Sequence, residues 1–170
     1  MNESTKTARA TSGIATTTSR RRSASVPVFR LKLVRDRMAR VPARAVESPH
    51  AAALLIGALI GASDRETFVA LFLSCNGIPV GATVIAIGSL TGLTLTPRET
   101  FKAAIMANAQ AVVLGHNHPS GNATPSREDL STTSMLVRAG KTVGIEVVDH
   151  IIVCPDGSFA SMLELGLLAA

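Results

Sequence analysis

The sequence predicts one α/β domain in which helices pack against a mixed β-sheet, preceded by a basic arm. Three observations predict this fold class. Helix-start signals alternate along the chain with apolar runs of strand length. Hydrophobic residues make up 46% of the 170 residues, which is enough for one core, and without Trp or Tyr that core must be mainly aliphatic. The excess positive charge lies in the first part of the chain, which therefore differs in composition from the rest.

Residues 1–45 are predicted to form the basic arm, and residues 46–170 the folded domain. The arm has eleven of the seventeen Lys and Arg residues against two acids, a net charge of +9, whereas the domain has six against ten, a net charge of −4. Residues 1–25 have too little apolar periodicity to offset the entropy of ordering, so they are expected to be disordered. Residues 26–46 alternate apolar and basic side chains at first, which fits an edge strand, a short helix or a segment that binds an acidic partner.

The first half of the domain is predicted to be a helix followed by a β-hairpin. The Ser-Pro pair at 48–49 supplies a capping residue and a first-turn proline for a helix that runs to Ala62. Residues 66–75 are apolar on both faces, as in a central strand that is covered on both sides. The Asn-Gly pair at 76–77 follows and predicts a type I′ turn into a second strand over 78–88.

The second half of the domain is predicted to alternate helices and strands. Thr96 and Glu99 form a capping-box pattern that opens a helix over 97–108. Ser126 opens a further helix that is expected to end before Gly140. The remaining predicted elements are strands over 111–118 and 144–154, a short strand after the turn at 155–158, and a terminal helix over 161–168. The predicted order is therefore α-β-β-α-β-α-β-β-α.

The cysteines and the apolar segments predict a cytoplasmic protein. Cys75 and Cys154 are far apart and form no CxxC pair, so two buried free thiols are expected rather than a disulfide. The apolar run over 51–62 is shorter than the roughly 20 residues that span a bilayer. No secretory signal pattern is present at the N-terminus.

The stretch GHNHPSGNATPSRED, residues 115–129, is the strongest functional signal. His116 and His118 are two residues apart at the end of a predicted strand, so their side chains point to the same side. Asp129 lies in the first turn of the next predicted helix, where it can reach back toward the histidines. Two imidazoles and one carboxylate leave one tetrahedral position of a zinc ion open, which is typical of a catalytic zinc.

A catalytic zinc lowers the pKa of a water in its open position, and hydrolysis then needs a general base. Glu66 and Glu99 are the candidates. Glu66 is favoured because it opens an otherwise apolar strand, whereas Glu99 already has a place in the capping box. Asp149 and His150, in the middle of a predicted strand, fit structural polar residues, groups behind the ligands or an alternative ligand pair.

A family resemblance adds to this interpretation. The HNHP motif at 116–119, six further residues and SRED at 126–129 resemble the JAMM signature of the JAB/MPN metalloprotease superfamily. The flanking sequence, with TPRETFKAAIMANAQAVVLG before the motif and DHIIV after it, resembles the RadC branch. The resemblance covers about residues 48–168. Asn117 also fits that branch, because deubiquitinase members have Ser or Thr between the histidines.

The resemblance implies a cytidine-deaminase-like α/β sandwich with a mixed sheet, and a zinc ion held by His116, His118 and Asp129. It also implies that Glu66 is the catalytic glutamate and that the Ser126 hydroxyl helps to hold a tetrahedral oxyanion. Full-length members of the RadC branch begin with a helix-hairpin-helix DNA-binding domain, whereas the basic arm precedes the domain here.

The expected function is zinc-dependent hydrolysis of an amide bond in a peptide or isopeptide substrate, with Glu66 moving the proton from water to the leaving amine. Two alternatives remain open. In the first, the protein is associated with DNA, in repair or in mobile elements, and its basic arm 1–45 binds phosphates. In the second, the domain is a non-catalytic MPN interaction module.

Overall fold

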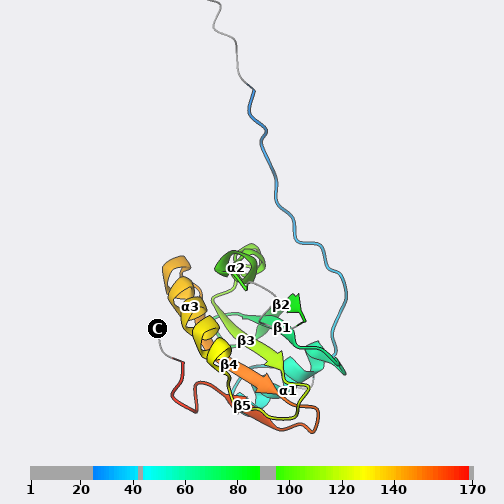
Figure 1. Cartoon of the computed structure of the whole chain (residues 1–170). Helices are drawn as coiled ribbons and strands as arrows, with labels where there is room; N and C mark the ends of the chain where they lie inside the picture. Colours follow the sequence, from blue (N-terminus) through cyan, green and yellow to red (C-terminus); the bar gives the residue numbers. More distant parts are fainter. Residues whose placement is uncertain (1–24, 42–43, 89–94, 169–170) are drawn as a thin grey trace, which may run out of the picture. The chain divides into compact units, whose positions relative to one another are not determined.

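The computed structural model describes residues 25–41, 44–88 and 95–168. The chain divides into two units, residues 1–30 and 31–170, and every helix and strand of the described residues lies in the second. In chain order (Figure 1) these are α1 (Pro49–Ile60), β1 (Thr67–Leu73), β2 (Pro79–Ile87), α2 (Pro97–Met106), β3 (Ala111–Asn117), α3 (Arg127–Val143), β4 (Glu146–Val153) and β5 (Phe159–Ser161).

The five strands form one mixed sheet in the order β2-β1-β3-β4-β5. β3 and β4 are parallel, and the other neighbouring pairs are antiparallel. The predicted mixed α/β fold is therefore confirmed. β1, β3 and β4 are the inner strands, so the carboxyl end of β3, where the HNHP motif begins, lies between two hydrogen-bonded neighbours.

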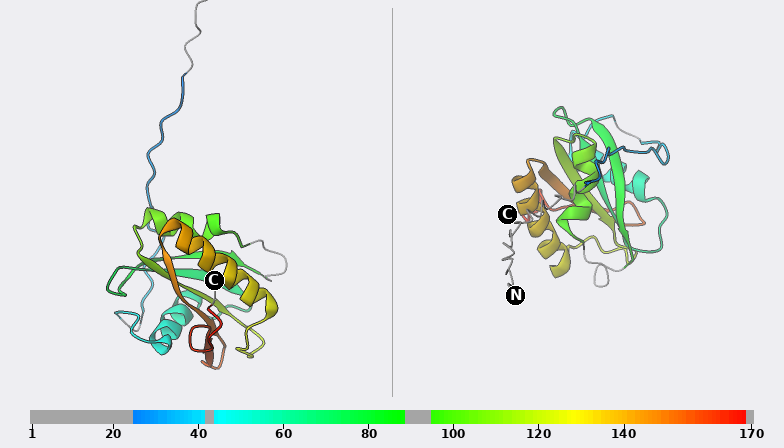
Figure 2. Two further views of the ribbon diagram at one scale, coloured as in Figure 1. Left: turned by 90° about the vertical axis from the view of Figure 1, so that its left-hand side faces the viewer. Right: turned by 90° about the horizontal axis from the view of Figure 1, so that it is seen from above.

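Helices cover both faces of the sheet (Figure 1; Figure 2). The buried side chains of β1 alternate between two hydrophobic clusters, and Val69 and Leu71 pack with Ile56 of α1. Phe68 and Phe72 pack on the other face with residues of α2 and α3, among them Phe101 and Leu136. All seven residues of β1 are buried, which confirms the prediction of a central strand covered on both sides.

The helices begin where the sequence predicts, but α3 ends later. The Ser48 hydroxyl caps α1 and accepts a hydrogen bond from the Ala51 N–H at 3.1 Å. Gly140 does not end α3: the helix continues to Val143, and Gly144 adopts the left-handed conformation, with φ of 75°. Gly140 is instead a packing residue, because a Cβ there would lie 2.5 Å from the backbone oxygen of Ile145.

The predicted terminal helix over 161–168 is wrong. β5 occupies Phe159–Ser161, and turns follow. One backbone bond has the i to i+4 spacing of an α-helix, from the Leu165 N–H to the Ser161 oxygen at 3.1 Å, but Gly166 has a positive φ of 69° and the helix does not continue. Met162 is buried while Leu163 is about half exposed, so this apolar run packs only in part.

Two predicted turn and cap details are also wrong. The β1–β2 hairpin exists, but a type I′ turn needs positive φ at both central residues, and only Gly77 has one, at 70°. The Thr96 hydroxyl does accept from the Glu99 N–H at 3.4 Å, but the Glu99 carboxylate pairs with Lys102 at 2.6 Å instead of closing a capping box.

Residues 25–41, the longer described stretch of the arm, contain neither helix nor strand, and nearly all of their side chains are exposed. The disorder predicted for residues 1–25 falls almost entirely on residues 1–24, which lie outside the described residues. Cys75 and Cys154 are both free, as predicted, but Cys75 is exposed rather than buried. Among the described residues there is no helix long and apolar enough to cross a membrane.

Candidate metal centre

The end of β3 places two histidines beside the start of α3. His116 is fully buried, and its ring stacks on that of Phe68, its partner in β1. His118 follows the last residue of β3 and is partly exposed. Because residues two apart on a strand share a face, both imidazoles point toward α3. The structure thus places the predicted HxH pair as the sequence predicts.

Asp129 reaches the histidines because a capping box holds it. The Ser126 hydroxyl accepts from the Asp129 N–H at 3.1 Å, and the Asp129 carboxylate accepts from the Ser126 N–H at 2.8 Å. This box turns the buried carboxylate toward the end of β3. Its Oδ1 lies 3.1 Å from His116 Nε2, and its Oδ2 lies 3.5 Å from His118 Nε2. The three predicted ligands, called the metal group below, therefore lie together.

The atoms of the metal group suit a cation. His118 Nδ1 lies 2.7 Å from the Asn122 carbonyl oxygen, which can only accept, so Nδ1 carries the hydrogen and the Nε2 lone pair faces inward. His116 Nε2 faces that lone pair at 3.0 Å. Asp129 Oδ1 is buried and accepts no hydrogen bond within the described residues. Two imidazole nitrogens and one unsatisfied carboxylate oxygen around one point fit a divalent metal such as zinc.

The electrostatics keep the carboxylate ionised. Burial by itself would raise the pKa of Asp129, but the adjacent His116 imidazole and the hydrogen bonds from Ser126 outweigh it and lower that pKa well below its usual range. An ionised carboxylate is the form that binds a metal.

A second layer of side chains lies behind the metal group. His150 on β4 is fully buried, and its Nε2 lies 2.8 Å from Nδ1 of His116. Nδ1 of His150 lies 2.6 Å from the Thr133 hydroxyl, which in turn donates to the backbone oxygen of Asp129 at 2.6 Å. Burial, followed by the charge of His116, lowers the pKa of His150 well below its usual value.

Asp149 and His150 have separate roles, because neighbours on a strand point to opposite faces. The Asp149 carboxylate accepts from the N–H groups of His150 and Leu163 and from the Ser161 hydroxyl, at 2.7, 3.0 and 2.7 Å. It therefore anchors the segment after β5, as a structural polar residue would. His150 contacts His116 of the metal group from behind, so the side chains of Asp149 and His150 do not converge on one point. Sequence reasoning missed Thr133, although its place four residues after Asp129 on α3 was a signal.

The position of Glu66 relative to the metal group can be inferred from the register of β1 and β3. Phe68 pairs with His116 across the antiparallel β1 and β3, and Glu66 precedes Phe68 by two residues. Extending that register by one pair on the same face places Glu66 opposite His118. Its side chain is half-buried. Glu99, the other predicted base, is about half exposed and pairs with Lys102.

The side chain of Asn117 fixes the segment around Glu66. Its Oδ1 accepts from the Thr67 N–H at 2.8 Å, and its Nδ2 donates to the backbone oxygens of Arg65 and Ser63 at 3.0 and 3.3 Å. These contacts bracket Glu66 on both sides. No local sequence pattern indicates this contact, because it spans fifty residues.

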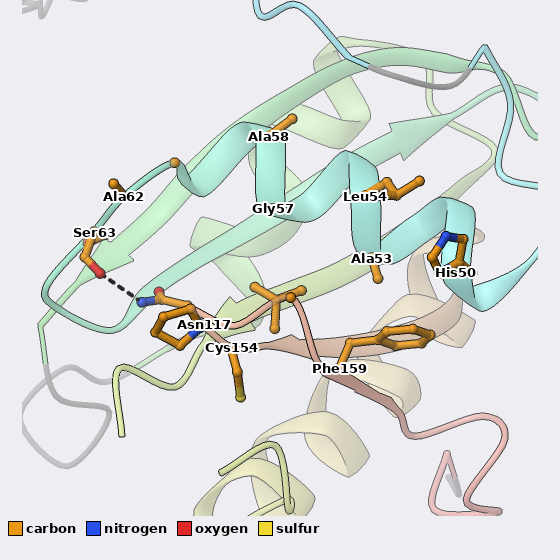
Figure 3. Close-up of a pocket in the computed structure, with 14 residues that line it drawn as sticks. His50, Ala53, Leu54, Gly57, Ala58, Ala62, Ser63, Asn117, Cys154 and Phe159 are labelled. Carbon is orange, nitrogen blue, oxygen red and sulfur yellow. Dashed lines mark hydrogen bonds between the residues drawn. The ribbon is translucent and has the colours of Figure 1, made fainter. Parts of the chain in front are cut away.

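Asn117 also lines a groove of about 520 Å³ next to α1 (Figure 3), where its hydrogen bond to Ser63 is visible. The rings of His50 and Phe159 lie at the other end of this groove, with centroids 5.8 Å apart. None of the three residues of the metal group lines it. Asn117 lies between His116 and His118 along the chain, so its side chain points to the opposite face of β3, toward the groove.

Comparisons with known proteins agree with this geometry. The family model of the RadC-like JAB domain matches residues 46–167. A UPF0758 protein of Methanosarcina mazei is 36% identical over 141 residues, which are 83% of this chain and 61% of that protein. A UPF0758 protein of Rubrobacter xylanophilus is 46% identical over 132 residues, 77% of this chain and 57% of that protein. The chain thus spans little more than half the length of these curated relatives.

The metal group fits the JAMM motif, and the mixed sheet with helices on both faces fits the JAB/MPN α/β fold. The match of the family model covers most of the chain, including all of its helices and strands among the described residues. On this evidence the chain belongs to the RadC-like JAB domain family.

Proposed function

We propose that this chain is a zinc-dependent hydrolase of amide bonds in peptide or isopeptide substrates. The observation that supports it most is the convergence of His116 Nε2, His118 Nε2 and the unsatisfied Oδ1 of Asp129 on one point. A zinc ion held by these atoms would polarise a carbonyl and lower the pKa of a water. Membership in a JAB family supports the same chemistry.

Glu66 is the proposed general base. It would take a proton from the attacking water and return it to the nitrogen of the leaving amine, as a positioned carboxylate does in general acid–base catalysis. Its place opposite His118 in the extended register supports this role. Asn117 would hold the backbone on both sides of Glu66, so that the carboxylate keeps its position during proton transfer.

The Ser126 hydroxyl has one hydrogen, which it can donate either to Asp129 or to an oxyanion of the substrate. Its hydroxyl donates to Asp129 Oδ2 at 2.6 Å, so in this arrangement the hydrogen is already used. Donation to an oxyanion, as the family resemblance implies, would require the hydroxyl to leave Asp129. We propose that Ser126 orients Asp129 in the resting protein, and its role toward the oxyanion stays a prediction.

The test compares two carboxylates. Glu66→Gln and Glu99→Gln are made in the full chain, and zinc content and cleavage of fluorogenic peptide and isopeptide substrates are measured with and without a chelator. Glu66→Gln is expected to keep its zinc but to lose roughly 10²- to 10⁴-fold in kcat/KM. Glu99→Gln is the matched control, because Glu99 pairs with Lys102 on the surface, and it should behave as wild type.

Three outcomes of this experiment would each contradict a different part of the proposal. A Glu66→Gln variant with full activity would contradict the proposed base. Stoichiometric zinc without cleavage of either substrate class would favour the non-catalytic interaction module. A His116→Ala variant that still binds zinc and cleaves amides would contradict the metal centre itself.

A further inference from the structure

We infer that His150 and Thr133 are positioning residues that hold His116 in the tautomer whose Nε2 lone pair faces the metal group. The inference rests on the proposed metal centre and adds two residues to it. A metal-binding histidine must present a lone pair, and the group bound to its other ring nitrogen decides which nitrogen that is.

The three side chains form an unbroken chain of contacts. His116 Nδ1 lies 2.8 Å from His150 Nε2, and His150 Nδ1 lies 2.6 Å from the Thr133 hydroxyl. All three side chains have 0% relative exposure. Water therefore does not compete for these hydrogen bonds, and each hydrogen must be assigned within the chain of contacts.

The hydrogens are assigned from the backbone end. The oxygen of Asp129 can only accept, and a Thr hydroxyl inside a helix commonly donates to the carbonyl four residues earlier, here at 2.6 Å. The sulfur of Met162, 3.2 Å from the same hydroxyl, is a weak acceptor and competes poorly. Thr133 has one hydrogen, so toward His150 it offers a lone pair. His150 Nδ1 must then carry a hydrogen.

The remaining assignments follow from neutrality. His150 contacts a hydroxyl and an imidazole, neither of them an anion, and a fully buried imidazolium without an anionic partner is costly. Neutral His150 with hydrogen on Nδ1 has its lone pair on Nε2. His116 Nδ1 must donate to that lone pair, and His116 Nε2 is left free of hydrogen, facing the metal group.

The two ligand histidines are thus fixed by different means. His118 donates to the Asn122 carbonyl, which cannot donate back, so its tautomer is set by one contact. His116 faces another imidazole, which can donate or accept, so this contact alone leaves its tautomer undecided. Thr133 fixes the tautomer of His150, and His150 in turn fixes the tautomer of His116. It also joins the backbone of Asp129 to the same chain of hydrogen bonds.

The experiment uses three variants of the full chain. Thr133→Val removes the hydroxyl with little change in shape, and Thr133→Ser restores it. Thr142→Val is the matched control, because Thr142 lies on the same helix and its hydroxyl makes the same bond to the carbonyl four residues earlier, Arg138 O at 3.0 Å, but it is exposed. Zinc affinity is measured by competition with a chromogenic chelator.

Thr133→Val is expected to weaken zinc binding about 10- to 100-fold, while Thr133→Ser and Thr142→Val stay close to wild type. A second measurement needs no variant. Long-range ¹H–¹⁵N NMR of the wild-type protein should find hydrogen on Nδ1 and a lone pair on Nε2 of His150. Disappearance of this NMR signature in Thr133→Val, with recovery in Thr133→Ser, would support the assignment further.

The outcomes distinguish this inference from the proposed function. Wild-type zinc affinity in a folded Thr133→Val variant, or hydrogen on Nε2 of His150 in the wild type, would overturn the inference and leave the metal centre intact. Tight zinc binding without amide hydrolysis would contradict the proposed activity and leave the inference intact. A wild-type protein that binds no zinc would contradict the metal centre and the inference together.

Discussion

The Asn117 side chain accepts a hydrogen bond from the backbone N–H of Thr67 at 2.8 Å, which joins the residue between the two histidines to the residue after Glu66. The same side chain donates to the oxygen of Arg65, the residue before Glu66. One amide thus couples the position of the proposed base to the strand that carries two of the proposed ligands.

Asn117→Ala is therefore expected to separate catalysis from metal binding. Loss of the amide leaves the Thr67 N–H unpaired in a buried place, which should cost about 1–3 kcal/mol in unfolding free energy. Misplacement of Glu66 should lower kcat about 10- to 100-fold. Zinc affinity should change little, because Asn117 contacts none of the ligand atoms. Asn76→Ala, in an exposed turn, is the control, and equal kcat in the two variants would contradict this role of Asn117.

Ser126→Ala is expected to weaken both the helix and the metal group. Loss of an N-cap hydroxyl should cost about 1 kcal/mol in unfolding free energy. Removal of its bond to Asp129 Oδ2 should also let the pKa of Asp129 rise toward its ordinary value and should lower zinc affinity. Unfolding by urea and chelator competition measure the two effects.

Ser48→Ala is the matched control for that experiment, since Ser48 caps α1 in the same way but far along the chain from the metal group. It should lose similar stability and no zinc affinity. If both variants lose stability and neither loses zinc, Ser126 acts only as a helix cap.

The ligand positions could be predicted from the sequence because they follow local rules. Residues two apart on a strand share a face, so His116 and His118 converge. Asp129 stands three residues after the N-cap Ser126, the position that a capping box uses. These rules involve a few neighbouring residues each, and they did not require the rest of the fold.

The positions that could not be predicted depend on contacts between distant residues. A register shift in the pairing of β3 with β4 places Asp149 opposite Val113 and His150 opposite Leu114, and His150 thereby faces the metal group. No local pattern shows that shift. The apolar residues of the segment after β5 are typical of a helix, but Met162 is buried beside the Thr133 hydroxyl and Gly166 adopts a positive φ.

Asp149→Asn is expected to change how stability depends on pH. Burial raises the pKa of Asp149 above its ordinary value of 3.8, despite the hydrogen bonds it accepts from Ser161, Leu163 and His150. The folded protein therefore holds this proton more tightly than the unfolded chain does. The contribution of Asp149 to unfolding free energy is then largest below its ordinary pKa and falls as pH rises through its raised pKa.

The advantage of wild type over Asp149→Asn should accordingly shrink as the pH rises above 3.8 and through the raised pKa of Asp149, measured by urea unfolding in chelator. Asp156→Asn is a control for which the opposite dependence of stability on pH is expected. Hydrogen bonds from the Ser158 hydroxyl and N–H lower the pKa of the exposed Asp156, so that wild type should gain over this variant as pH rises through 3.8. Parallel trends in the two variants would contradict the assignment for Asp149.

The basic arm gives the prediction that tests the DNA-associated alternative. Among residues 25–41 it exposes five basic side chains and one acidic one, namely Arg30, Lys32, Arg35, Arg37, Arg40 and Asp36. Replacing the five basic residues by Gln in the full chain should weaken binding to duplex DNA.

The slope of log affinity against log salt should become shallower by about 0.9 for each phosphate that the arm no longer neutralises, measured by fluorescence anisotropy between about 50 and about 200 mM salt. Arg138→Gln with Lys141→Gln on α3 removes two positive charges outside the arm and is the control for loss of charge elsewhere in the chain. If the arm variant and this control bind DNA with the same slope as wild type, residues 25–41 of the arm do not bind phosphate, and this support for the DNA-associated alternative is lost.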